Sequence, residues 1–222
     1  MQSTLETSAA TLERSPAVAS SAPRGRRHHV LWLGGGTAGN EQLVATVGVL
    51  LIALFAVMGI TVIGITVLRV HQLIDVHMFV GVLLAGPVGL KLGATGYRFT
   101  RYYTGNPAYR RKGPPKLSLR LLAPVLVLST LSLFLSGFVL MLEGVSRSPQ
   151  VMLIHKASFL IWITVAALHV LSHLPRLGRS LRAVRSSHLT VAPGVAGRWL
   201  LVAGALAGGM ALAIVLSAHF AI

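Results

Sequence analysis

Five long apolar runs decide the fold class of this chain. They hold about 22–26 residues each and lie at about residues 43–68, 71–92, 119–142, 151–174 and 199–221. The hydrocarbon core of a bilayer is about 30 Å thick, so a helix crosses it with about 20 apolar residues. Each backbone polar group in lipid must be bonded within the protein, and a helix meets that need by itself. We therefore predict an all-α bundle of five membrane-spanning helices.

The composition supports a membrane protein and excludes several other classes. Hydrophobic residues make up 54% of the chain and charged residues 11%, against about 25% charged residues in soluble domains. A net charge of +15 could indicate a nucleic-acid partner, but the basic residues lie between apolar runs, so we predict no such partner. Because the chain has no cysteine, disulfides and thiolate-bound metals are excluded.

The loop charges predict the topology. With the N-terminus inside, 17 of the 20 Lys and Arg residues fall on the inner side, and Arg69, Arg147 and Lys156 fall outside. Inner loops carry such an excess, so we predict a multi-pass protein of the cell (inner) membrane with its N-terminus inside and C-terminus outside. Residues 1–40 are polar, and we predict a disordered cytoplasmic tail before the bundle of residues 41–222.

Two further features concern packing and lipid. The fifth run contains Gly204 and Gly208, a small-xxx-small spacing that is common where membrane helices pack. The segment 96–116 is predicted to be a basic, aromatic loop on the cytoplasmic side. Such a segment suits contact with anionic lipid and could also dock a partner.

The fourth run carries His155, His169 and His173. Ionisable residues inside a membrane are costly and point to function. At about 100° per residue, all three imidazoles fall on one face of a helix, with His169 about 21 Å from His155 along the axis.

His77 in the second run lies at nearly the same depth as His155 under the predicted topology. A porphyrin iron takes one axial nitrogen from each side, so two such imidazoles predict a haem between two helices, and Gly81 would give the ring room. His71 lies about 240° around the helix from His77. It is the competing ligand, and we expect it at the membrane interface.

The roles of His169 and His173, in the cytoplasmic half of the fourth run, are open to several interpretations. His169 or His173 could hold a second haem, contact haem propionates or bind a quinone head group, and they could also be a polar pair at the interface. The position that matches His169 in the second run is Lys91, so a second haem lacks an opposing imidazole. One haem b is therefore expected, with a second left open.

The pattern resembles the bacterial membrane b-type cytochromes, including cytochrome b subunits and ferric-reductase-like transmembrane domains. The similarity rests on a histidine in the second span, the pair His155 and Lys156, and a further histidine at His169. It implies haem b, with His77 and His155 as one axial pair and His169 as a ligand of a second haem.

The resulting expectation is an electron-transfer protein that works between quinol or another donor and a partner redox protein. It would be at most the membrane subunit of an oxidoreductase. The alternative is a haem-free polytopic protein, either a transporter or an assembly subunit, whose histidines serve polar packing or proton transfer.

Overall fold

The computed structural model describes residues 36–113, 117–144, 146–184 and 194–220. The predicted tail thus lies outside the described residues up to position 35, while residues 36–40 form the start of the first helix. The helices are α1 (Gly36–Thr66), α2 (Leu73–Tyr103), α3 (Pro107–Arg110), α4 (Leu117–Glu143), α5 (Pro149–Val184) and α6 (Val195–Phe220).

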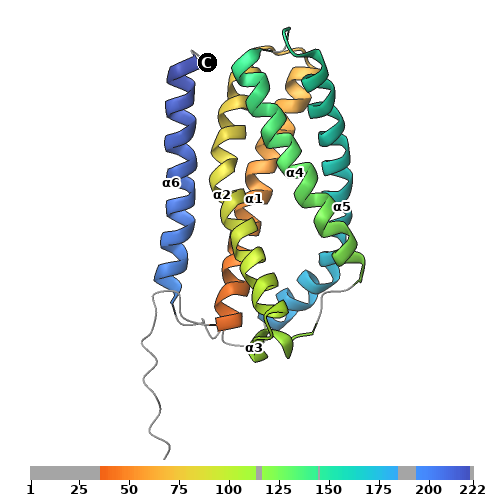
Figure 1. The fold of residues 1–222 in the computed structure, drawn as a ribbon, viewed down its shortest axis with the longest axis vertical. Helices are drawn as coiled ribbons and strands as arrows, with labels where there is room; N and C mark the ends of the chain where they lie inside the picture. The colour runs from red at the N-terminus through yellow and green to blue at the C-terminus, as the bar shows by residue number, and fades with distance from the viewer. Residues whose placement is uncertain (1–35, 114–116, 145, 185–193, 221–222) are drawn as a thin grey trace, which may run out of the picture. The chain divides into compact units, whose positions relative to one another are not determined.

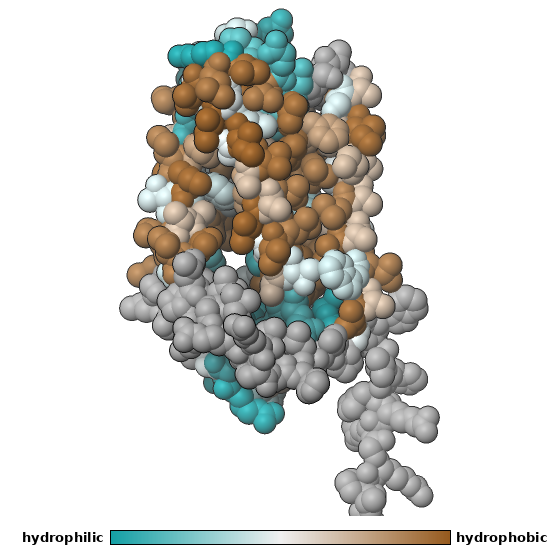
Figure 2. Space-filling view, turned by 180° about the vertical axis from the view of Figure 1, so that it is seen from behind, coloured by the Kyte–Doolittle hydropathy of each residue, from teal (hydrophilic) through white to brown (hydrophobic). Residues whose placement is uncertain are grey.

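Five of these helices, all but the single turn α3, are long and apolar enough to cross a membrane. The predicted all-α architecture with five spans is therefore confirmed. Figure 2 shows hydrophobic side chains over the length of the helices and hydrophilic ones toward the ends. Large apolar residues such as Val49, Leu128 and Leu153 are about 70% exposed, as expected where lipid, not water, surrounds the protein.

The helices run alternately up and down, so the bundle has two distinct ends (Figure 1). We call the end where α1 and α4 finish and α2 and α5 begin the histidine end. The other, where α2 finishes and α3 lies, we call the basic end.

Two groups of helices make up the bundle. In the first, α2 packs along both α1 and α6, and in the second, α4 packs along α5. Contacts between the groups are fewer and lie mainly between α2 and α4. The apolar core belongs to the first group and is centred on Val47, which is completely buried, with Leu84 and Val88.

Glycines set the distance between α2 and α6. A Cβ at Gly86 would overlap the Ala205 carbonyl group, and a Cβ at Gly209 would overlap the Leu83 carbonyl group. By contrast, a Cβ at Gly204 or Gly208, the spacing noted in the sequence, would meet no atom within 4 Å. These two glycines line an open apolar groove of about 290 Å³ beside α2. The packing role predicted for this pair therefore belongs to Gly209, one residue further on.

Helix α2 is longer than its apolar run. It continues to Tyr103, so the first part of the predicted loop 96–116 is helical. The backbone bonds of a helix persist into the polar zone because they do not depend on lipid. At the other end α2 starts at Leu73, and His71 lies before it in the turn from α1.

Candidate functional site: a histidine layer

His77 lies in the second turn of α2 and faces α1. Its Nδ1 is 3.0 Å from the Thr61 hydroxyl oxygen, and that hydroxyl donates to the Met58 carbonyl oxygen at 2.7 Å. A threonine hydroxyl has one hydrogen. Since that hydrogen is used on Met58, the oxygen accepts from Nδ1–H. In the neutral form of the ring, Nε2 of His77 therefore carries the lone pair.

His155 repeats this arrangement in the other helix group. Its Nδ1 is 2.9 Å from the Ser136 hydroxyl oxygen, and this hydroxyl donates to the Ser132 carbonyl oxygen at 2.6 Å. By the same reasoning Nδ1–H donates and Nε2 has the lone pair. A Cβ at Gly137 would lie 3.2 Å from Cε1 of His155, so this glycine lets the imidazole lie close to the backbone of α4.

The two imidazoles come from different helix groups and lie close enough for a charge on His155 to act on His77. Both are half-buried, and their hydroxyl partners Thr61 and Ser136 are 2% and 5% exposed. All four residues lie within about 11 Å of the histidine end, at about 1.5 Å per helical residue. We call Thr61, His77, Ser136 and His155 the histidine layer.

Polar and aromatic groups continue from this layer toward the middle of the bundle. Ser132 and Ser158 join α4 to α5 through a hydroxyl–hydroxyl bond of 2.7 Å. Further along, Trp162 donates its indole N–H to the Thr130 hydroxyl at 3.0 Å. The Trp162 ring also packs on Phe55 of α1, with centroids 4.7 Å apart. This aromatic contact joins α1 of the first helix group to α5 of the second.

The remaining predicted residues lie elsewhere. His71 is exposed in the turn before α2. Gly81 faces α1, where a Cβ would lie 3.9 Å from the Met58 methyl group. His169 is half-buried on α5, and His173 is on the same helix with its side chain outside the described residues. The structure thus brings His77 and His155 together, with Gly81 one turn from His77 on α2, and places His71 and His169 apart from them.

Lys91, at the depth of His169, contacts α1. Its ammonium donates to the Val44 carbonyl oxygen, and a Cβ at Gly48 would lie 3.0 Å from it. The glycine leaves room for a cation that would otherwise face apolar side chains.

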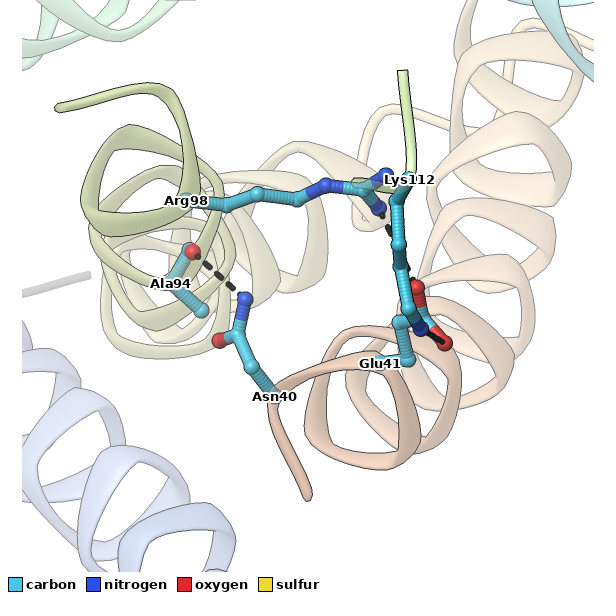
Figure 3. A network of polar contacts seen from close by, with 5 residues as sticks. All are labelled: Asn40, Glu41, Ala94, Arg98 and Lys112. Carbon is cyan, nitrogen blue, oxygen red and sulfur yellow. Dashed lines mark hydrogen bonds and ion pairs between the residues drawn. The ribbon is translucent and has the colours of Figure 1, made fainter. Parts of the chain in front are cut away.

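Figure 3 shows how the basic end is joined. Asn40 donates to the Ala94 carbonyl oxygen at 3.4 Å, and the Glu41 carboxylate pairs with Lys112 at 2.7 Å and with Arg98 at 3.8 Å. These contacts connect the start of α1 to the end of α2 and to the segment after α3.

Tyr109 of α3 is buried beside this network. Burial raises the pKa of its phenol, and the neighbouring Tyr97 raises it further. The Tyr97 ring meets the Tyr109 ring edge to face, with centroids 6.1 Å apart.

Comparisons with protein-family models, curated proteins and solved structures find no match to this chain. The chemistry must therefore be inferred from the residues themselves. In the described part of the chain, no three His, Cys, Asp or Glu side chains converge, whereas a protein-ligated zinc site takes three or four ligands. The donor set at the histidine layer is the imidazoles of His77 and His155.

This donor set fits haem iron. Haem iron takes up to two ligands from the protein, and the imidazoles of His77 and His155 on separate helices would supply them. Histidines that bind a metal usually donate their second ring N–H to a neighbouring acceptor, and here Thr61 and Ser136 accept it.

The hydroxyl partners were not among the predicted residues. The sequence did contain a signal for them. Thr61 and Ser136 lie a few residues before the ends of their apolar runs, and His77 and His155 lie a few residues after the starts of theirs, so all four fall at a similar depth. Counting hydroxyls as well as histidines by depth would have pointed to them.

Proposed function

We propose that this chain is an integral-membrane electron-transfer protein that binds haem b, with His77 and His155 as the two axial ligands. The observation that carries the proposal is the matched pair of tautomers: each ring is fixed at Nδ1 by a hydroxyl that is itself committed to a backbone carbonyl. Both Nε2 lone pairs are thereby kept for a ligand. Polar packing of a single histidine would not explain why the same arrangement of imidazole, hydroxyl and carbonyl occurs twice, on two pairs of helices.

Each residue of the histidine layer has a definite part in this proposal. Thr61 and Ser136 fix the ring orientations, and a hydrogen bond at Nδ1 raises the basicity of the ligating nitrogen. When bound, haem supplies a one-electron redox couple. With His77 and His155 both holding the iron, no position would be left for a substrate, which would suit electron transfer and not oxygen chemistry.

One haem is favoured over two. His169 lies about 21 Å further along α5 from His155. At that depth, the described residues of α1, α2 and α4 include no histidine, and α2 offers Lys91, which contacts Val44. His169 and His173 remain candidates for a quinone head group or for a second haem.

The proposed partners follow from the chemistry. We infer that electrons pass between quinol, or another donor, and a partner redox protein, so that the chain is at most the membrane subunit of an oxidoreductase. The 17 basic residues on one side of the predicted topology support a cytoplasmic basic end and an inner-membrane location.

A reduced-minus-oxidised spectrum tests the haem. The full chain is produced in haem-replete cells, purified in detergent and reduced with dithionite, and we expect Soret and α bands typical of bis-histidine haem b. His77→Ala and His155→Ala should lose them, while His71→Ala, the matched control at an exposed histidine, should keep them.

Folding of each variant is checked by circular dichroism and size-exclusion chromatography, and added imidazole should restore bands to a folded His155→Ala protein. Absence of bands in the wild-type protein would contradict haem binding and favour polar packing or proton transfer by the histidines. Unchanged bands in both folded alanine variants would contradict the ligand assignment.

A further inference from the structure

The end of α2 extends beyond what is needed to cross a membrane. About 20 residues suffice, so a span that begins at Leu73 is complete near Gly93, and the last ten residues of the 31-residue helix project past it. Residues 95–101 are all exposed. This part of α2, with the following turn α3, therefore lies at the level of the lipid head groups.

Positive charge is concentrated at this level and is only partly neutralised. Six basic side chains at the end of α2, in and after α3 and at the start of α4 are exposed: Arg98, Arg101, Arg110, Arg111, Lys112 and Arg120. Glu41 is the one carboxylate that the described residues place near them, and it is shared by Arg98 and Lys112. The other four arginines are left without a carboxylate in the described ranges.

The neutral contacts of these arginines leave most of their N–H groups available. Arg101 lies over the Tyr97 ring at 5.9 Å, and Arg120 donates to the Tyr103 hydroxyl at 3.2 Å. Arg111 donates to the Pro107 carbonyl oxygen at 3.4 Å. Each guanidinium has five N–H donors, and their planar arrangement suits phosphate oxygens.

Aromatic rings interleave with the arginines along the same stretch. Phe99 is 63% exposed and Tyr103 is 57% exposed, and their rings pack together with centroids 4.4 Å apart. Exposed aromatic rings beside basic residues suit the boundary between head groups and acyl chains.

The opposite end lacks this combination. Its described charges are nearly balanced, with Arg69, Arg147 and Lys156 against Asp75 and Glu143. Because of this asymmetry, only one of the two membrane leaflets is in contact with a strongly positive protein surface.

We propose that the collar formed by Arg101, Arg110, Arg111 and Arg120, with Phe99 and Tyr103, is a binding surface for the phosphate head groups of anionic phospholipid. The ion pairs of Glu41 with Arg98 and Lys112 hold the segment after α3 against α1. This brings Arg110 and Arg111 to the level of the arginines at the end of α2. The surface is independent of the histidine layer.

Lipid selectivity measured by electron paramagnetic resonance tests the collar. The full chain is reconstituted in phosphatidylcholine vesicles that contain a trace of spin-labelled phosphatidylglycerol or spin-labelled phosphatidylcholine. We expect the wild-type protein to retain phosphatidylglycerol preferentially at 0.05 M salt and to lose most of this preference at 0.5 M salt, because screening weakens exposed charges. Each arginine near an anionic surface contributes at most about fivefold.

The matched variants carry equal changes in charge. Arg101→Gln, Arg110→Gln and Arg111→Gln combined should lower the preference by about twofold to fivefold. The control Arg69→Gln, Arg147→Gln and Lys156→Gln combined should leave it unchanged, and lysine replacements at the three collar positions should retain most of it.

Three results would overturn the proposal. They are equal retention of the two lipids by the wild-type protein, an equal loss in both triple variants, and a preference that salt does not alter. The wild-type salt series and the lysine variant decide the matter even if the glutamine variant fails to fold. Because the assay does not involve haem, its result stands apart from that of the spectrum.

Discussion

The contact between α2 and α6 yields the sharpest stability prediction. Gly86→Ala places a methyl group on the Ala205 carbonyl group, and Gly209→Ala places one on the Leu83 carbonyl group. Overpacking costs about 1–3 kcal/mol, and backbone atoms cannot rotate away, so we take about 3 kcal/mol. Replacing a helical glycine by alanine returns about 0.5–1 kcal/mol, which leaves each variant less stable by about 2 kcal/mol.

The two substitutions should not be additive. Once the first methyl group has moved α6 away from α2, the second finds part of its space already open. We expect the double variant to cost about 3 kcal/mol instead of about 4 kcal/mol, a coupling of about 1 kcal/mol that is typical of residues in contact.

Unfolding by sodium dodecyl sulfate in mixed micelles, followed by circular dichroism, measures these free energies. Gly204→Ala and Gly208→Ala are matched controls on the same helix, because a Cβ at either position meets nothing within 4 Å. They should be neutral or slightly stabilising. Control variants as unstable as Gly86→Ala, or strictly additive costs, would refute this account of the α2–α6 contact.

Three further predictions concern polar groups. Gly48→Ala should destabilise the protein by about 1–2 kcal/mol by displacing the Lys91 ammonium; in a Lys91→Met background the same unfolding titration should find little cost. Glu41→Gln should lower stability by about 1 kcal/mol or less at low salt and by less at high salt, since its ion pairs are partly exposed; a salt-independent loss would count against this. Thr61→Val and Ser136→Ala should lower haem content or shift the haem midpoint potential, read by redox titration of the α band; unaltered haem content and potential in both would disprove the positioning role.

The number of spans could be read from the sequence, whereas helix ends could not. Apolar length decides whether a segment crosses a bilayer, and all five runs proved to be helices. Where a helix stops depends on local backbone bonding, so α2 runs on to Tyr103 through residues that hydropathy assigns to a loop.

The glycines of α6 show a second limit of sequence reasoning. Small residues occupy 203–205 and 207–209, so more than one pair of small residues four positions apart could face a partner helix. The pair that packs on α2 is decided by that helix, where Gly86 lies against the backbone of Ala205 and Gly209.

The candidate site was predictable in part. His77 and His155 could be paired by depth because both lie shortly after the start of a span on the same side. Their hydroxyl partners are on α1 and α4, and only the packing of these helices reveals that Thr61 and Ser136 reach Nδ1.

The placement of α6 has a consequence for biogenesis. Gly86 and Ala205 are far apart in the sequence, so α2 enters the membrane long before its partner helix has been synthesised. Until α6 arrives, the notch at Gly86 is open to lipid or to other membrane proteins. The α2–α6 contact therefore forms only after α6 has entered the membrane.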